Sequence, residues 1–325
     1  MRALARLLCL VLACAAALPA FAQDAASFPN RTVRIIVGFP PGGSSDVTAR
    51  IVAERMSEEW KQPVIVENKP GAASTIAAAY VAASPADGYT ILHLGPGTHA
   101  ISSFTYKGLA YDPVKSFAGI GNIAFSPFVV VVPVDSPFKS LREIIDAAKA
   151  KPGQVSYASS GSGGGPNLVT EVIASSAGVK FLHVPYKGTG PAAAAAVAGQ
   201  VNFATVDSAS AIPYVKGGKL RALAVTTEKR SVLFKDVPSV AEAAVPGFAY
   251  PSAVGLAAPA GTPREVVLKI NAALNRALAQ APVRERLEAL GFEAAPMSPD
   301  EFQAFLAGEV AKYGKVVRDL GLKVD

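Results

Sequence analysis

Two turns rich in glycine and serine hold the residue types best suited to bind a small polar ligand. The first turn contains Gly42, Gly43, Ser44, Ser45 and Asp46. The second turn contains Ser159, Ser160, Gly161, Ser162 and Gly163. Glycine lets backbone N–H groups turn toward a ligand, serine adds a hydroxyl donor, and a following helix adds partial positive charge. Both turns are therefore suited to holding an anion or a polar head group.

Neither turn matches a nucleotide-binding motif. Both lack the Gly-Lys-Ser/Thr ending of a P-loop, whose lysine reaches the phosphates. Residues 161–166 read Gly-Ser-Gly-Gly-Gly-Pro, with proline in place of the third glycine of the dinucleotide motif G-x-G-x-x-G. No acidic residue nearby has a clear role toward a ribose. We therefore expect no cofactor.

The histidines and acidic residues show no catalytic pattern. His93, His99 and His183 lack the spacing of a metal site, and no G-x-S-x-G nucleophile motif occurs. His183 ends an apolar run, so we interpret it as structural. Asp46 and Asp207 could form an acid/base pair, but a helix first turn and a strand end give each a structural role as well. We expect a protein that is not an enzyme and holds no metal.

The N-terminal residues predict export from the cytoplasm. Arg2 and Arg6 form a basic start, followed by an apolar run over residues 7–17 and then by Ala20-Phe21-Ala22. This order is typical of a signal peptide with small residues at its cleavage site. We expect cleavage after Ala22, so that residues 1–22 are removed and the mature protein lies in the periplasm.

Cysteine content and charge exclude several further functions. Cys9 and Cys14 are the two cysteines of the chain, so the mature protein would have no disulfide, cysteine metal site or cysteine nucleophile. Lipid attachment at Cys14 is the alternative to cleavage after Ala22. The chain carries 31 Lys and Arg against 25 Asp and Glu. Because the basic residues are scattered, nothing favours binding of nucleic acid.

Short β-rich runs alternate with helical patterns along the chain, which predicts a largely parallel α/β fold. The runs are rich in Val, Ile and Phe, as expected of strands buried on both faces. They cover residues 33–39, 64–67, 90–94, 129–132, 155–158, 181–184, 201–206 and 220–226. The length of 325 residues indicates two domains. A strand, a Gly/Ser turn and a helix follow one another once in each half, so both turns should lie where parallel strands end and ligands bind.

Helix start signals are clearest near the C-terminus. Residues 262–265 read Thr-Pro-Arg-Glu, which predicts a helix with Thr262 as N-cap and Glu265 completing a capping box. Residues 298–301 read Ser-Pro-Asp-Glu and predict the same arrangement for a second helix. Apolar residues at three- and four-residue spacing follow each signal, so both helices should pack on a sheet.

A set of segments in this order resembles one family of binding proteins. The segments are residues 39–46, 66–72, 85–90, 157–163, 183–188, 217–225 and 258–263. Together they span nearly the whole mature chain and look like the Bug-type, or TctC-like, periplasmic solute receptors of tripartite tricarboxylate transporters. One departure is Pro166-Asn167, where family members often have a Ser/Thr-His-Leu stretch.

The resemblance implies a Venus-flytrap protein with a ligand cleft between two α/β lobes. Lobe one would comprise residues 24–126 and 254–325, and lobe two residues 127–253. By position in the family, lobe one offers Phe39, the turn from Gly42 to Asp46, and Thr98. Lobe two offers the turn from Ser159 to Gly163, together with Gly188, Thr189 and Asp207.

The expected function is capture of a small organic acid for delivery to integral-membrane transporter subunits, by a monomer. A sensor that signals to a membrane protein is one alternative, and an exported hydrolase using Asp46 and Asp207 is another. Neither turn contains Arg or Lys, and both acids should add negative charge near the mouth of the cleft. We therefore expect a ligand with one or two carboxylates, or a neutral carbonyl analogue, rather than citrate or a phosphate ester.

Overall fold

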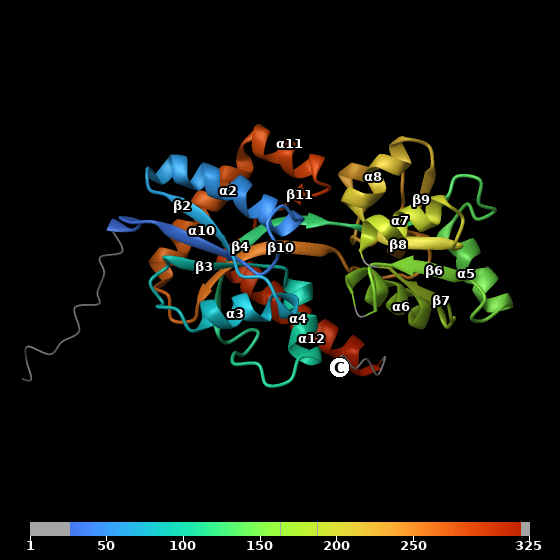
Figure 1. Ribbon diagram of the computed structural model, residues 1–325, viewed down its shortest axis with the longest axis horizontal. Helices are drawn as coiled ribbons and strands as arrows, with labels where there is room; N and C mark the ends of the chain where they lie inside the picture. The colour runs from blue at the N-terminus through green and yellow to red at the C-terminus, as the bar shows by residue number, and fades with distance from the viewer. Residues whose placement is uncertain (1–26, 163, 187, 320–325) are drawn as a thin grey trace, which may run out of the picture.

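The chain forms two α/β lobes placed end to end along the long axis of the molecule (Figure 1). The structure is a computed structural model that describes residues 27–162, 164–186 and 188–319. The predicted cleavage site, Cys14 and Gly163 lie outside the described residues.

Lobe one is built on a six-stranded sheet in the order β11-β4-β10-β3-β1-β2. Its strands are β1 Val33–Val37, β2 Val64–Asn68, β3 Thr90–Leu94, β4 Phe117–Ser126, β10 Ser252–Pro259 and β11 Glu293–Ala294. Its helices are α2 Ser44–Trp60, α3 Thr75–Ala82, α4 Pro96–Thr105, α10 Arg264–Ala279, α11 Ala281–Ala289 and α12 Pro299–Asp319, with a short 3-10 helix η2 at Ala72–Ser74. Helices α2, α10 and α11 share one apolar core with the sheet, and α3 and α12 share the core on its other face.

Lobe two is built on a five-stranded sheet in the order β7-β6-β8-β5-β9. Its strands are β5 Phe128–Pro133, β6 Ser156–Ser159, β7 Leu182–Pro185, β8 Phe203–Asp207 and β9 Leu220–Val225. Its helices are α5 Leu141–Ala150, α6 Gly165–Ala177, α7 Thr189–Val197, α8 Ser208–Lys216 and α9 Val240–Ala243, with a short 3-10 helix η3 at Val232–Phe234. Helices α5, α6 and α9 cover one face of the sheet, and α7 and α8 cover the other.

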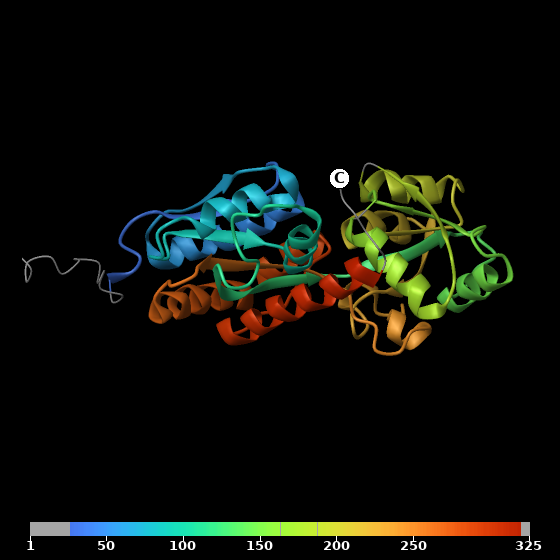
Figure 2. The ribbon, with the colours of Figure 1, turned by 90° about the horizontal axis from the view of Figure 1, so that it is seen from below.

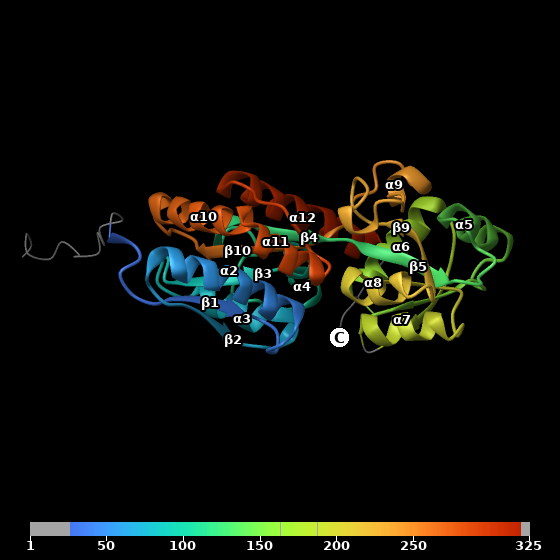
Figure 3. The ribbon, with the colours of Figure 1, turned by 90° about the horizontal axis from the view of Figure 1, so that it is seen from above.

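Two chain segments cross side by side between the lobes. Only Pro127 separates β4 from β5, so the first crossing is nearly continuous (Figure 3). The second crossing returns through Tyr250 into β10, where Ser252 lies in register opposite Ser126. At the lobe-two end, the buried Thr226 binds both segments: its hydroxyl accepts from the Phe128 N–H at 2.9 Å, and its carbonyl accepts from the Tyr250 N–H at 2.9 Å. The connection is therefore a paired ribbon.

Both sheets are mixed, so the prediction of a largely parallel fold is wrong in this respect. Strands β1, β2 and β3 are parallel, as are β6, β7 and β8, but β10, β4 and β11 pair antiparallel, and β5 is antiparallel to β8 and β9. Strands β4 and β10 were not predicted, because glycine and alanine weaken their strand signal. Those glycines have a packing reason: a Cβ at Gly255 would come within 2.3 Å of the Phe302 ring.

The two C-terminal helix starts differ from one another. At α12, Ser298 and Glu301 form the predicted reciprocal pair: the Glu301 carboxylate accepts from the Ser298 N–H at 2.8 Å, and the Ser298 hydroxyl accepts from the Glu301 N–H at 3.3 Å. At α10, the prediction is wrong. The N-cap is Pro263, and the Thr262 hydroxyl instead donates to the Pro259 carbonyl at 2.8 Å, which stabilises the preceding turn.

Candidate functional site

The carboxyl ends of the parallel strands in each lobe point toward the other lobe. β4 leads out of lobe one, and β1 and β3 run in the same direction as β4. β5 leads away from lobe one, and β6, β7 and β8 run in the opposite direction to β5. Helices α2, α4, α6, α7 and α8 each begin just after one of these strands, so their N-termini face the junction of the lobes (Figure 1).

Four of these five helices begin with glycine as N-cap. The N-caps are Gly43 for α2, Gly95 for α4, Gly164 for α6 and Gly188 for α7. A glycine has no side chain to accept hydrogen bonds from the first helical turn, so the free N–H groups of the turn remain available to a ligand. Helix α8 differs because its N-cap Asp207 accepts from the Ser210 N–H at 2.8 Å. The junction therefore collects neutral donors and positive dipole ends from both lobes.

Asp46 shapes the lobe-one turn from beneath. Its carboxylate accepts hydrogen bonds from the Gly42 N–H at 3.0 Å, from two guanidinium nitrogens of Arg50 at 2.9 Å each, and from the Asn68 amide at 2.9 Å. The Asn68 amide also donates to the Phe39 carbonyl at 3.0 Å. The Asp46 side chain is only 4% exposed, and the Arg50 guanidinium holds the pKa of this carboxyl well below its usual range.

This arrangement corrects one expectation about charge. Asp46 was expected to add negative charge at the mouth of the cleft, and that is wrong because its carboxylate is buried and paired with Arg50. The exposed part of the turn consists of Gly42, Gly43 and Ser44, with Ser45 half-buried. Gly42 has φ +82°, a conformation that favours glycine and turns its N–H back toward Asp46.

A second buried contact supports the same turn from the sheet. The Thr48 hydroxyl lies 3.1 Å from His93 Nε2 and donates to the Ser44 carbonyl at 2.8 Å. Burial lowers the pKa of His93 to about 4, so its ring is neutral at neutral pH. The ring therefore links β3 to the first turn of α2 without adding charge to the site.

In lobe two, Ser159 and His183 anchor the start of the second turn. Ser159 is fully buried at the end of β6, and its Oγ lies 2.7 Å from His183 Nε2 and accepts from the Gly161 N–H at 3.3 Å. Gly161 has φ +123°, which a residue with a side chain rarely adopts. Burial lowers the pKa of His183, and the structural role predicted for this histidine is confirmed. Ser160 is half-buried and Ser162 is exposed.

The far end of the same turn is held by Tyr157, whose ring stacks on His183. The Asn167 amide donates to the Tyr157 hydroxyl at 2.6 Å, and that hydroxyl donates to Glu171 at 2.6 Å. The Tyr157 ring stacks on His183 with ring centroids 4.8 Å apart. Asn167, which departs from the family pattern, therefore fixes the entry into α6.

Asp207 and Thr189 bind to each other at the edge of the lobe-two strands. The Thr189 hydroxyl donates to Asp207 Oδ2 at 2.7 Å and accepts from the Ser210 hydroxyl at 3.0 Å. Asp207 thus both caps α8 and holds the first residue of α7, so the predicted structural role of Asp207 is confirmed. Gly188, with φ +117°, precedes Thr189 and lets α7 begin at this sharp bend.

A small pocket lies at the floor of the junction, between the lobes. It has a volume of about 30 Å³, which is room for one oxygen-sized group. The pocket lies among the first turn of α4, the first turn of α6, both crossing segments and α12. Its lining residues are Gly97, Thr98, Ile101, Phe128, Gly165, Pro251, Ser252, Ala253 and Tyr313.

The pocket brings Thr98, a site residue implied by the family resemblance, together with residues that were not predicted. Phe128 and Tyr313 carry no signal of a site in the sequence, because the crossing segment and the C-terminal helix reach the pocket only in the folded chain. Gly165 is the first residue of α6, and a Cβ there would come within 2.7 Å of the Phe128 ring. The presence of glycine at this position is therefore explained by close packing.

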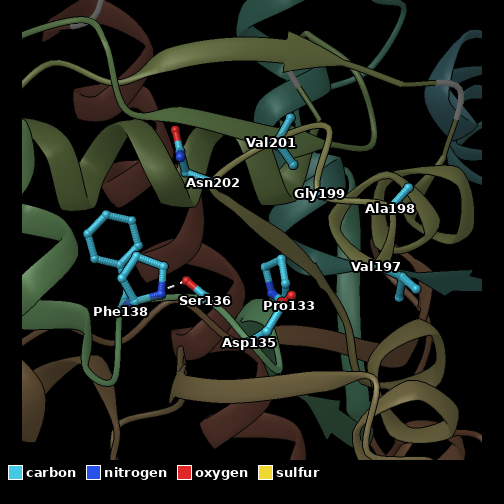
Figure 4. Close-up of a pocket in the computed structure, with 10 residues that line it drawn as sticks. Pro133, Asp135, Ser136, Phe138, Val197, Ala198, Gly199, Val201 and Asn202 are labelled. Carbon is cyan, nitrogen blue, oxygen red and sulfur yellow. Dashed lines mark hydrogen bonds between the residues drawn. The ribbon is translucent and has the colours of Figure 1, made fainter.

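A larger pocket of about 350 Å³ lies on lobe two, at the opposite end of its parallel strands (Figure 4). It is lined by the segments after β5, after α7 and before β8. Asn202 in this lining is already engaged, since its Oδ1 accepts from the Ser156 N–H at 2.8 Å. The uncapped helix N-termini lie at the other edge of the sheet, so this pocket does not share their donors.

Within the described residues, no three His, Cys, Asp or Glu side chains are grouped to hold a metal ion. Nor is any helix in the described part of the chain both long and apolar enough to cross a membrane.

Comparisons with known proteins agree on one family. A family model described as the tripartite tricarboxylate transporter family receptor matches residues 48–322. BugT of Bordetella pertussis is 33% identical, and the match covers 93% of this chain and 93% of BugT. A solved structure of an R. palustris protein with adipate is 34% identical with a TM-score of 0.77, covering 92% of this chain and 100% of that chain. MatC from Rhodopseudomonas palustris with bound malate is 33% identical with a TM-score of 0.71, covering 89% and 100% respectively.

Proposed function

Since the chain belongs to the tripartite tricarboxylate transporter receptor family, we propose that it captures a small organic acid between its lobes and delivers it to a membrane transporter. Members of this family are periplasmic solute-binding receptors rather than enzymes. The observation that carries the proposal is the convergence of four glycine-capped helix N-termini from the two lobes. Free N–H groups at such ends favour carboxylate oxygens.

The proposed binding residues belong to both lobes. In lobe one they are Phe39, Gly42, Gly43, Ser44, Ser45, Asp46 and Thr98. In lobe two they are Ser159, Ser160, Gly161, Ser162, Gly163, Gly188, Thr189 and Asp207. The proposed lobes comprise residues 24–126 with 254–325, and residues 127–253. Asp46, Ser159 and Asp207 act by shaping the turns, because each is engaged by neighbouring protein groups.

The donors favour a ligand with one or two carboxylates over citrate or a phosphate ester. Neither turn contains Arg or Lys, and the nearby Arg50 is already paired with Asp46. A charge-assisted hydrogen bond contributes about 1.5–3 kcal/mol net. Three or four such hydrogen bonds would offset the loss of rigid-body freedom on binding. They would give a micromolar dissociation constant, which corresponds to a binding free energy of roughly −8 kcal/mol. The adipate and malate in the structures of the two solved relatives each carry two carboxylates.

The proposed location is the periplasm, with a soluble, monomeric mature protein that begins at Gln23. N-terminal sequencing of periplasmic material tests the cleavage, and a lipid-modified Cys14 would contradict it. The proposed partners are the ligand and the integral-membrane subunits of the transporter.

The binding function is tested by thermal-shift screening of the purified protein. The compounds are mono-, di- and tricarboxylates, amino acids and sugar phosphates. We expect mono- or dicarboxylates to raise the melting temperature most. Strong stabilisation by citrate alone, or by phosphates alone, would contradict the proposed ligand class.

A pair of variants then locates the binding. Gly43 has φ −75° and ψ 167°, and the nearest atom to an added Cβ is the Pro40 carbonyl at 3.5 Å. Gly43→Val should therefore fold normally while its side chain covers the uncapped N-terminus of α2 and abolishes binding. Gly308→Val is the matched control, because an added Cβ there meets no atom within 4 Å. Equal affinities for the two variants would remove the lobe-one turn from the site.

A further inference from the structure

Tyr313, in α12, brings a hydroxyl group to the floor pocket. The residue is only 2% exposed and lines the pocket between the lobes. Its ring contacts the Tyr250 ring and the Lys312 ammonium. A tyrosine hydroxyl can donate a hydrogen bond, so its position beside a pocket between the lobes is informative.

The hydroxyl end of the ring lies directly against the first turn of α4. A Cβ on Gly97 would come within 3.3 Å of the Tyr313 hydroxyl and 3.2 Å of its ring. Glycine at this position therefore lets the hydroxyl approach an uncapped helix N-terminus. On the other side of the pocket, Gly165 in the first turn of α6 packs against Phe128 in the same way. Each lobe thus places a glycine-capped helix and one aromatic ring at the floor.

Residues of the second crossing segment and of α12 pack around the Tyr313 ring. Tyr250, in the second crossing segment, packs edge-on against Tyr313 with ring centroids 5.8 Å apart. The Lys312 ammonium lies 5.2 Å from the Tyr313 ring centroid and donates to the Ala249 carbonyl at 3.2 Å. Burial and the nearby Glu309 carboxylate raise the pKa of Tyr313, so the hydroxyl stays protonated and can donate.

We propose that the Tyr313 hydroxyl donates a hydrogen bond to an oxygen atom of the bound acid at this floor pocket, between the N-termini of α4 and α6. The proposal rests on the proposed function and deepens it. The pocket has room for one oxygen-sized group, and its lining combines the hydroxyl-bearing Thr98, Ser252 and Tyr313 with apolar side chains such as Ile101 and Phe128. With one carboxylate held by the Gly/Ser turns, as proposed above, a donor at the floor favours acids with a second oxygen function at the other end of the molecule.

A tyrosine elsewhere in lobe one provides a matched control. The Tyr111 hydroxyl is buried without a hydrogen-bond partner, and its ring packs against His99 and Phe117. It does not line the floor pocket. Tyr111→Phe and Tyr313→Phe each remove one hydroxyl from a ring that packs against other aromatic rings, and only Tyr313→Phe removes it from the pocket.

The test is calorimetric titration of wild type and both variants. The probes are the dicarboxylates succinate, glutarate and adipate and the monocarboxylates butyrate, pentanoate and hexanoate. For the dicarboxylate that wild type binds best, Tyr313→Phe should weaken binding about tenfold, as expected for one hydrogen bond to a charged group. Binding of the monocarboxylate of equal length should change less than about twofold on the same scale. Tyr111→Phe should alter neither.

Two results would overturn the inference alone. One is unchanged dicarboxylate affinity in Tyr313→Phe, and the other is an equal loss for both kinds of acid, which would indicate a structural role. Failure of wild type to bind any of the six acids would overturn the proposed function as well. Melting curves of the variants without ligand separate these outcomes from a folding defect, because Phe preserves the ring packing and should preserve the melting temperature.

Discussion

Replacing Asp46 with asparagine should destabilise the protein, because Asp46 organises the lobe-one turn. The carboxylate accepts four hydrogen bonds, from Gly42, Asn68 and twice from Arg50. In Asp46→Asn, one oxygen becomes an NH₂ group that faces these donors, so at least two of the bonds are lost. Hydrogen bonds to a charged group contribute about 1.5–3 kcal/mol each. The Arg50 side chain is 50% exposed, so solvent screening lowers the total loss to about 2–3 kcal/mol.

The assay is thermal unfolding followed by circular dichroism. A change of about 1 kcal/mol shifts the melting temperature by about 2–4 °C in a domain of 150–250 residues. Asp46→Asn should therefore melt about 5–10 °C below wild type at pH 7. Asp300→Asn is the control, since Asp300 also lies in a helix first turn beside an arginine but is 79% exposed. It should shift the melting temperature by less than about 2 °C, as expected of an exposed ion pair.

The pH dependence gives a second reading of the same variant. The pKa of Asp46 is lower in the folded protein than its ordinary value of 3.8. Its contribution is therefore fully present above pH 3.8 and is lost as the pH falls through the folded pKa. The difference between wild type and Asp46→Asn should be constant from pH 5 to 8 and should shrink below about pH 4. Equal melting of Asp46→Asn and Asp300→Asn at pH 7 would refute the reasoning.

Three further predictions concern buried histidines, helix packing and a helix cap. Burial lowers the pKa of both His93 and His99 from 6.5 to about 4, so each should cost about 2 kcal/mol of stability as the pH falls from 6.5 to about 4.5. Urea unfolding across this range measures the loss, and a flat profile would contradict it. Gly165→Ala should lower the melting temperature and weaken ligand binding, because its Cβ meets an aromatic ring at 2.7 Å; an unchanged affinity would show that the ring moves aside freely. Asp207→Ala should cost about 1 kcal/mol through loss of the N-cap, whereas Asp207→Asn should stay near wild type in urea unfolding, and equal losses would argue against capping.

The sequence predicted most strands that lie in runs rich in Val, Ile and Phe. The residues of β1, β2 and β3 were found in this way, within one or two residues at each end. Strands β4 and β10 were not found because their glycines and alanines make room for helix side chains. Gly121, for example, would place a Cβ 2.7 Å from the Asn271 amide of α10. Such a strand is specified by what packs on it, which a local pattern does not reveal.

The candidate site was predictable only in part, for a related reason. The two Gly/Ser turns can be recognised from their composition. Their backbone takes positive φ at Gly42 and Gly161, and this conformation favours glycine. Phe128 and Tyr313 have no such local requirement. They reach the floor pocket because two crossing segments and α12 meet there, and Figure 2 shows α12 extending along lobe one toward lobe two. Their role follows from tertiary contacts alone.

The role of Asp46 shows the same limit at a single residue. Its place in a helix first turn was predictable from the sequence. Its pairing with Arg50 at four residues' spacing and with Asn68 from β2 depends on the packing of α2 against the sheet. Because of that packing, the Asp46 carboxylate is buried and its charge is neutralised by Arg50, whereas the sequence suggested an exposed charge.

The most direct test of the central claim is hydrogen–deuterium exchange by mass spectrometry, with and without a saturating dicarboxylate from the thermal-shift screen. If the ligand binds to helix N-termini of both lobes, exchange should slow together in peptides covering residues 42–48, 96–101, 161–168 and 188–192. Peptides lining the separate lobe-two pocket, such as 197–202, should be unaffected. Slowed exchange confined to one lobe, or centred on residues 197–202, would contradict binding between the lobes.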